Sequence, residues 1–482
     1  MFGPVRWPPE AWVPFASGLA WNVVAVSAGL PWGVLALVPG TFLLASGGGM
    51  LLLPGDRRLS HFAALGAVLG VLLAPLAFAA PPPPAFAATL ALGLALASAA
   101  SFLAAGYHAL RLDAHPEDVP VPERTARLAA EVGLDEAMLG TMMFTQKFPS
   151  SADHARIERE VALAREQFAD AGWLEKPEGY HVCPADACKG DAVRRRTRGV
   201  AFEHLSFASE YEPRAGEPGR ERWLGYAENR TAHAWVVRKN PARPWLVCLH
   251  GYRMGSPLID LSAFHPSWLH RHLGFNLVVP VLPLHGPRSF ARSGDGFLGG
   301  DLLDTIHAEA QAMWDLRRLI AWIRAGSDAP IGVYGLSLGG YTTALLASLD
   351  DRLCCAVAGI PATDFARTFF RHGGPWQERA ALHVGLTQEK MAEVLRVISP
   401  LALTPKVPHA GRAIFAGVGD RLVPPDQVRD LWRHWGEPRI VWYQGSHLTL
   451  GMHPDVREIT ETTLRNTLGG IDWSAEPTDG SA

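Results

Sequence analysis

The segment IGVYGLSLGG, residues 331–340, is an apolar run that ends in a serine between two glycines. Gly335, Ser337 and Gly339 form the pattern G-x-S-x-G, which is a weak signal by itself because the chain contains 48 glycines. The pattern gains meaning where a strand precedes the serine and a helix follows it. Here the apolar run PIGVYG precedes Ser337, and the helical pattern YTTALLASL follows it. We therefore predict a tight strand-to-helix turn that exposes the Ser337 hydroxyl.

The region around this turn alternates between short apolar runs and helical patterns. A long amphipathic helix is expected over residues 304–326, and strands are expected on both sides of it along the chain. These strands cover residues 202–211, 231–239, 244–251, 276–286, 330–335, 354–360 and 412–420. Strands that alternate with helices form a mostly parallel sheet with helices on both faces. The sequence therefore predicts an α/β fold for residues 199–470.

A serine hydroxyl becomes a good nucleophile when a base takes its proton, so a histidine and an orienting carboxylate are expected further along the chain. Asp420 follows an apolar strand, and His447 lies in a loop after the next one, RIVWYQG. In this arrangement His447 accepts the proton of Ser337, and Asp420 holds the imidazole in the correct tautomer. Asp426 and His453 are weaker alternatives, because Asp426 lies deeper in an expected helix and His453 opens the last one.

Backbone N–H groups beside the nucleophile are expected to stabilise the oxyanion of the tetrahedral intermediate. The N–H of Leu338, at the start of the helix, is one candidate, and the N–H of Tyr252 in the turn LHGYRMG is the other. His250 in the same turn is expected to brace it rather than to transfer protons. His285, in the segment LPLHGPR, is expected to fix its loop or to line the pocket wall.

These segments lie within a region of a little over half of the chain, and this region resembles the α/β-hydrolase family. LHGY is similar to the oxyanion turn of the family, GLSLGG to its nucleophile elbow, GVGDRLVPP to its acid loop and GSHLTL to its histidine loop. LPLHGPR resembles the branch that contains dienelactone hydrolase and the prolyl-oligopeptidase-like esterases. The resemblance implies a sheet of the eight-strand type with Ser337, Asp420 and His447 as the catalytic triad, and neither a metal nor a cofactor.

Residues 361–410 form an insertion rich in Phe, Trp and His. In the α/β-hydrolase fold such an insertion often caps the pocket. Its aromatic residues Phe365, Phe369, Phe370 and Trp376 either bind an acyl chain or pack the cap itself.

Two long blocks near the N-terminus, residues 11–55 and 59–110, contain no Asp, Glu, Lys or Arg. A bilayer core of about 30 Å is crossed by about 20 helical residues, so each block is long enough for two spans. GLPWG and PPPP offer breaks within the blocks. The expected spans are residues 12–30, 32–53, 61–80 and 85–108. The first segment contains Trp21, Asn22 and Ser27, and it could instead be re-entrant or interfacial.

Basic residues near the ends of the spans predict the orientation. With four spans, all of these arginines fall on one side: Arg6, Arg57, Arg58, Arg111, Arg124 and Arg127. The breaks at residues 29–33 and 81–84 contain no basic residue. That side is expected to face the cytoplasm, together with everything after residue 110.

Residues 111–198 are polar and are expected to form a helical linker. The segment 151–173 has a helical stripe of apolar residues, which predicts a helix packed on the next domain or docked between domain and membrane. The basic segment VRRRTR, residues 193–198, could contact anionic headgroups or be a solvated linker. The chain has 44 basic and 47 acidic residues, which gives no reason to expect a nucleic-acid partner, and its five cysteines do not form a disulfide framework.

The sequence therefore predicts an integral membrane protein with a membrane region (1–110), a linker (111–198), a hydrolase domain (199–470) and a flexible tail (471–482). The expected function is that of a membrane-anchored serine hydrolase, with a small-molecule or lipid ester as substrate. An acyltransferase would use the same acyl-enzyme, with an alcohol or amine in place of water. A non-catalytic membrane scaffold is the third reading, and the complete triad argues against it.

Overall fold

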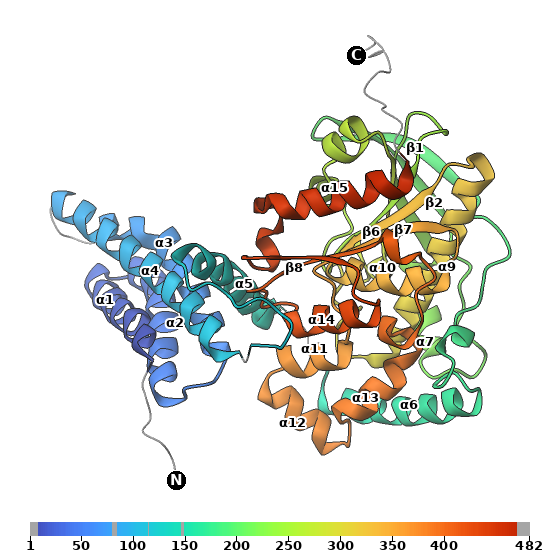
Figure 1. Cartoon of the computed structure of the whole chain (residues 1–482). Coiled ribbons are helices and arrows are strands. Elements are labelled where there is room, and N and C mark those ends of the chain that lie inside the picture. The colour runs from blue at the N-terminus through green and yellow to red at the C-terminus, as the bar shows by residue number, and fades with distance from the viewer. Residues whose placement is uncertain (1–7, 80–83, 114, 146–148, 470–482) are drawn as a thin grey trace. The chain divides into compact units, whose positions relative to one another are not determined.

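The computed structural model of the chain describes residues 8–79, 84–113, 115–145 and 149–469 (Figure 1). The chain forms two compact units. The first unit contains residues 1–146 together with two short segments, 416–426 and 442–454, and the second unit contains the rest. The apolar helices belong to the first unit, and most of the sheet belongs to the second.

Four apolar helices make up most of the first unit: α1 (Trp12–Ala28), α2 (Trp32–Leu52), α3 (Arg58–Leu73) and α4 (Pro84–Leu112). Short turns, η1 (Pro9–Ala11) and η2 (Ala74–Ala79), adjoin α1 and α3. Candidate spans of 20, 21, 19 and 27 residues in this region are long and apolar enough to cross a membrane, which confirms the predicted number. The first break lies at Gly29, whose φ of 64° is in the left-handed region that glycine adopts without steric strain. Residues 81–83 of the second break lie outside the described residues.

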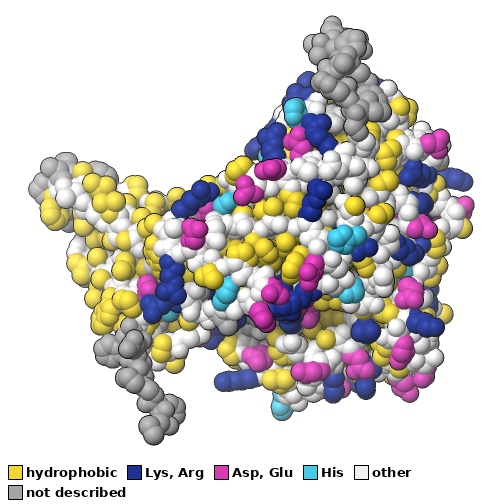
Figure 2. Space-filling model, in the orientation of Figure 1, with side chains coloured by type: hydrophobic (Ala, Val, Ile, Leu, Met, Phe, Trp, Pro, Cys, Tyr) yellow, Lys and Arg dark blue, Asp and Glu magenta, His cyan; other side chains and the backbone are white. Residues whose placement is uncertain are grey.

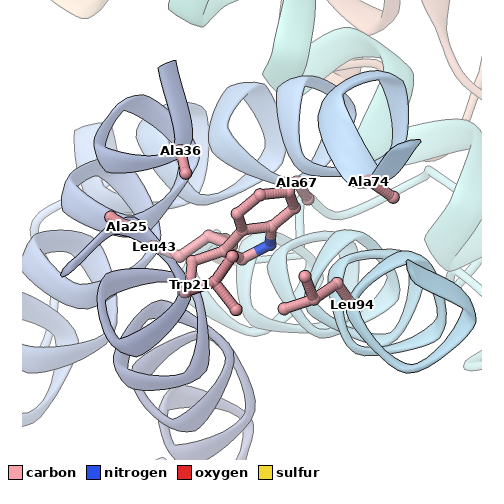
Figure 3. Packing of buried hydrophobic residues seen from close by; sticks show 8 residues of the cluster. Trp21, Ala25, Ala36, Leu43, Ala67, Ala74 and Leu94 are labelled. Atoms are coloured by element: carbon pink, nitrogen blue, oxygen red, sulfur yellow. The ribbon is translucent and has the colours of Figure 1, made fainter. Parts of the chain in front are cut away.

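Trp21 lies in the buried core of these helices, together with Val24, Ala25, Ala36, Leu43, Ala67, Ala74 and Leu94 (Figure 3). Its indole N–H donates a hydrogen bond to Ser98 Oγ at 3.0 Å. The side chains of Asn22 and Ser27 donate to carbonyl groups one turn earlier in α1, each at 2.8 Å. The three residues that weaken the first span in sequence therefore all have partners inside the protein, as polar groups within a bilayer require.

The outer surface of α1–α4 is apolar. Aliphatic side chains such as those of Val23, Val26, Leu92 and Leu96 are more than half exposed, at 66%, 84%, 61% and 62%. Figure 2 shows mostly hydrophobic side chains over these helices and few charged ones. A contiguous apolar surface of this kind is suited to contact with lipid.

A nine-stranded sheet runs in the order β1-β2-β3-β5-β4-β6-β7-β8-β9. The pairs from β5 through β4, β6 and β7 to β8 are parallel, whereas β1, β2 and β3 join antiparallel at one edge. The strands are β1 (Gly190–Thr197), β2 (Val200–Ala208), β3 (Thr231–Val237), β4 (Trp245–Leu249), β5 (Asn276–Pro280), β6 (Ile331–Leu336), β7 (Leu353–Gly359), β8 (Arg412–Gly417) and β9 (Arg439–Tyr443). The strands β4, β5 and β6 are buried along their whole length, as expected of parallel strands covered on both faces.

Helices cover both faces of this sheet. Figure 1 shows α15 on one side of the strands and α9 and α10 on the other. The helices that follow the strands are α8 (Pro257–Phe264), α9 (Leu302–Gly326), α10 (Leu338–Leu349), α14 (Pro425–His434) and α15 (Pro454–Leu468), and α7 (Arg220–Leu224) is a single short turn before β3. The predicted α/β fold is therefore confirmed.

The expected linker contains two helices, α5 (Ala126–Thr145) and α6 (Ser151–Asp170), and a strand. The apolar stripe of α6 is buried, and α6 packs against α9 within the second unit, which supports a helix packed on the sheet domain. The basic segment 193–198 lies largely in β1, and this corrects its assignment to a linker. Its backbone pairs with β2 at the edge of the sheet, and its arginine side chains are exposed. The segment therefore lacks the apolar residues by which a strand is recognised in a sequence.

Candidate active site

Ser337 sits in the predicted turn between β6 and α10. Its φ is 58° and its ψ is −115°, a strained conformation for a residue with a side chain. The turn packs so closely that two of its positions have room for glycine only. A Cβ at Gly339 would lie 1.9 Å from the Leu249 carbonyl oxygen, and a Cβ at Gly335 would lie 2.0 Å from the Gly339 oxygen. Ser337 is partly exposed, while its neighbours on both sides are buried. The local context expected of a nucleophile elbow is confirmed.

The turn after β4 lies beside this elbow. A Cβ at Gly251 would lie 3.6 Å from Ser337 Cβ, so the backbone at Gly251 approaches the serine closely. The N–H of Tyr252 belongs to this turn. Leu338 is the first residue of α10, and the N–H of a first helical residue has no acceptor within its helix. Both N–H groups therefore remain the candidates for an oxyanion hole.

His250 and His285 support the loops around this turn. The N–H of Leu282 donates to His250 Nε2 at 3.1 Å, so the other ring nitrogen carries the proton and donates to the Gly251 carbonyl at 2.9 Å. His285 is fully buried, and its Nδ1 lies 2.9 Å from the Pro283 carbonyl oxygen. Burial holds the pKa of His285 well below its usual value, which keeps the ring neutral. These contacts favour a bracing role for both residues.

Asp420 and His447 form a buried pair within the first unit. Asp420 follows β8, and His447 opens η10 (His447–Met452) after β9. His447 Nδ1 lies 2.7 Å from Asp420 Oδ2, while Asp420 Oδ1 accepts the N–H of Val423 at 2.7 Å. Burial opposes the imidazolium form, but the carboxylates of Asp420 and Asp135 outweigh it and raise the pKa of His447 above its usual value. The pair is therefore suited to accept a proton and to stabilise the resulting cation.

The two alternative residues have other surroundings. Asp426 lies in the first turn of α14. His453 Nε2 lies 2.9 Å from Glu131 Oε2, and its ring packs on that of Tyr443 at 4.6 Å. His447, rather than His453, is the histidine that contacts Asp420.

Sequence reasoning missed Asp135, a third buried group beside this pair. Its Oδ2 accepts the backbone N–H groups of Arg421 and His447 at 3.0 and 2.9 Å, and its Oδ1 accepts that of Leu448 at 3.1 Å. Asp135 belongs to α5, which precedes the sheet in the chain and has no catalytic motif. Nothing in its local sequence signals this contact.

The insertion forms three short helices: α11 (Phe365–His372), α12 (Pro375–His383) and α13 (Gln388–Leu395). Phe365 is buried and stacks on Tyr341 of α10, with ring centroids 4.0 Å apart. Phe369 and Phe370 are half-buried, whereas Trp376 is 76% exposed. Phe365 therefore packs the insertion onto the sheet domain. Among the residues that the structure describes, no group of three or more His, Cys, Asp or Glu side chains could hold a metal ion.

In the mostly parallel sheet, strand β6 leads through a strained serine turn into a helix, and an aspartate and a histidine follow later strands. This arrangement defines the α/β-hydrolase fold. The chain belongs to the same family as two proteins of Mycobacterium tuberculosis: "Uncharacterized protein MT2702" of strain CDC 1551 / Oshkosh and "Uncharacterized protein Rv2627c" of strain ATCC 25618 / H37Rv. Each is 41% identical over 375 residues, which cover 77% of this chain and 90% of the relative. No family model matches the chain.

Solved structures of esterases are similar to this chain at low sequence identity. Acetyl xylan esterase from Paenibacillus sp. R4 is 14% identical, with a TM-score of 0.42 over 67% of this chain and 98% of that one. Acetyl xylan esterase 1 from Thermoanaerobacterium sp. JW/SL YS485 is 15% identical, with a TM-score of 0.43 over 61% and 93%. An esterase from Pyrococcus furiosus is 16% identical, with a TM-score of 0.36 over 60% and 98%.

Proposed function

We propose that this protein is a membrane-anchored serine hydrolase that cleaves a carboxylic ester through an acyl-enzyme on Ser337. The observation that carries the proposal is the strained backbone of Ser337, with φ of 58°, in a chain that also holds a buried Asp420–His447 pair. A strained residue persists where the surrounding structure holds it, and such residues cluster at active sites. With Nδ1 engaged by Asp420, Nε2 is the nitrogen of His447 that exchanges protons.

In the proposed reaction, His447 Nε2 takes the proton of the Ser337 hydroxyl as Oγ attacks the carbonyl carbon of the ester. The electron pair of the carbonyl bond moves to oxygen, and the N–H groups of Leu338 and Tyr252 stabilise this oxyanion. The intermediate collapses when the imidazolium gives its proton to the leaving alcohol, and the acyl-enzyme remains. Water then attacks with the same base, and the acid is released as Ser337 regains its proton.

The substrate is proposed to be a lipophilic ester. The four apolar helices would hold the enzyme at a bilayer, where such esters concentrate. Phe369 and Phe370, which are half-buried in the insertion, are proposed to contact the acyl chain, while Phe365 and His285 are assigned to packing. The hydrolase unit is proposed to face the cytoplasm, because the arginines near the span ends fall on one side.

Labelling of the full-length protein in detergent by a fluorophosphonate probe tests this proposal. The expected result is one adduct on the peptide that contains Ser337, together with turnover of p-nitrophenyl esters from acetyl to palmitoyl and a preference for the longer chains. Product analysis with an added alcohol separates hydrolysis from acyl transfer. An adduct on a different serine, or ester turnover without any adduct, would refute the assignment of Ser337.

A further inference from the structure

The polar face of α5 carries three buried carboxylates. Glu131, Asp135 and Glu136 are 4%, 0% and 0% exposed. Buried carboxylates are unfavourable unless donors surround them. All three take their donors in part from the loops that hold Asp420 and His447.

Asp135 ties these two loops together with one side chain. It accepts the backbone N–H of Arg421, the residue after Asp420, at 3.0 Å. It also accepts the N–H groups of His447 and Leu448, at 2.9 and 3.1 Å. The backbone positions of the acid and of the base therefore depend on the same carboxylate.

The two neighbouring carboxylates, Glu136 and Glu131, also bond the acid loop and the histidine loop. Glu136 accepts from Arg421 Nε at 2.9 Å, and its other oxygen lies 2.6 Å from His61 Nδ1 of α3. Glu131 accepts the Thr449 hydroxyl at 2.6 Å and lies 2.9 Å from His453 Nε2. Helix α5 in turn packs against α3 and α4. The acid and histidine loops are therefore bonded to the helical part of the first unit.

The glycines of the two loops allow this close approach. A Cβ at Gly419 would lie 2.9 Å from Val132 Cγ2, and a Cβ at Gly445 would lie 2.6 Å from Glu131 Oε2. The acid loop and the histidine loop thus pack directly on α5. A side chain at either glycine would push its loop away from the helix.

We propose that Asp135 is a positioning residue of the hydrolase: it fixes the loops of Asp420 and His447 together, and its charge stabilises the imidazolium that forms when His447 accepts the serine proton. This inference rests on the proposed function and deepens it. The enzyme then depends on a helix outside the sheet domain for the geometry of its base.

Burial, followed by the charges around it, determines the ionisation of Asp135. Burial raises the pKa of Asp135 to about 7, and the charge of Asp420 adds to this, while His447 and the backbone N–H donors lower it. Arg421 faces the same site from the acid loop, and Glu131 and Glu136 lie within one turn on α5. The ionised form of Asp135 raises the pKa of His447. Removing this charge therefore lowers the pKa of His447 and moves the acidic limb of kcat/KM to lower pH.

The test compares Asp135→Asn with Asp118→Asn in the full-length protein. Asp118 is exposed in the same unit, and its φ of 64° is one that asparagine tolerates. Loss of the charge-assisted bonds is expected to lower kcat/KM of Asp135→Asn about 10- to 100-fold at pH 8, with the acidic limb moved to lower pH. Asp118→Asn should keep both quantities. The inference is overturned if Asp135→Asn stays within about twofold of wild type, or if its acidic limb does not move.

Two further variants keep the result interpretable. If Asp135→Asn does not fold, Glu131→Gln decides, because it weakens the bonds to Thr449 and His453 in the histidine loop, together with the bond from the exposed Arg127 on the same helix. A fall of about 3- to 10-fold in kcat/KM supports the inference, and unchanged activity overturns it. Ser337→Ala separates the two proposals. If that variant keeps its activity, the proposed function fails; if it is inactive while Asp135→Asn behaves as wild type, the inference on Asp135 alone fails.

Discussion

At Ser337 the backbone occupies a conformation that costs a residue with a side chain about 1–3 kcal/mol. The surrounding contacts stabilise it, since its N–H donates to the Gly359 carbonyl at 2.9 Å and its own carbonyl accepts the N–H of Tyr341 at 3.0 Å. In the proposed reaction the Asp420–His447 pair is the base, and the pKa of His447 lies above the usual value for histidine. At the scale of single residues, the proposed chemistry thus depends on strain at the nucleophile and on charge at the base.

Asp420→Asn is predicted to lower kcat about 10³- to 10⁴-fold, because an amide at this position favours the wrong imidazole tautomer. Asp426→Asn should change kcat by no more than about threefold, since Asp426 lies in the first turn of α14 and His447 pairs with Asp420. Steady-state kinetics on both variants, with melting temperatures as a check on folding, make the comparison. A larger loss for Asp426→Asn would place the acid there.

At the scale of elements, close packing between β4 and α10 shapes the elbow. Gly339 approaches the last residue of β4, and Gly340 approaches Gly359 and Pro361 after β7, where a Cβ would lie 2.8 Å from the Gly359 oxygen. The helix that begins at Leu338 therefore sits directly on the ends of two strands. Side chains larger than hydrogen at these positions would push α10 away from the sheet.

Gly339→Ala is predicted to destabilise the protein by about 3 kcal/mol or more, because the new Cβ would lie 1.9 Å from the Leu249 oxygen and backbone atoms would have to move. Gly326→Ala at the end of α9 is the control, since a Cβ at that position would meet no atom within 4 Å apart from its chain neighbours and the nearby backbone of its own helix. It should change stability by no more than about 0.5 kcal/mol. Equal melting temperatures for the two variants would show that the elbow tolerates a side chain.

The sequence was informative where chemistry and periodicity are local. The turn at Ser337, the Asp420 and His447 loops and the four apolar helices each carry their signal within a short stretch of sequence, and the buried stripe of α6 follows from helical spacing. Asp135 gave no signal, because its partners lie 286 to 313 residues further along the chain. The strand β1 was missed because an exposed edge strand with consecutive arginines lacks apolar alternation.

At the scale of the whole molecule, four helices that could cross a membrane precede an α/β-hydrolase fold, and each of the two compact units is built from separate stretches of the chain. The segments 416–426 and 442–454, which contain Asp420 and His447, belong to the unit of the apolar helices. The family relationship covers 77% of the chain, so it extends well beyond the 146 N-terminal residues.

Reporter fusions are predicted to place the region after residue 115 in the cytoplasm and residues 81–84 on the opposite face. The reason is the arginine distribution: Arg57, Arg58 and Arg111 lie on one side of four spans, while both short breaks are uncharged. Alkaline phosphatase and green fluorescent protein fusions at these points give the map. An external report after residue 115 would mean that one segment does not span, and the hydrolase unit would then work outside.

Turnover of a p-nitrophenyl ester by full-length Ser337→Ala is the most direct test of Ser337 as the nucleophile. The control is Ser262→Ala, since Ser262 is exposed on α8 and its hydroxyl donates only to the Leu258 carbonyl of its own helix at 2.6 Å. We predict a loss on the order of 10³-fold or more for Ser337→Ala, with an unchanged melting temperature, and wild-type turnover for the control. Retention of more than about a tenth of wild-type activity by Ser337→Ala would mean that Ser337 is not the nucleophile.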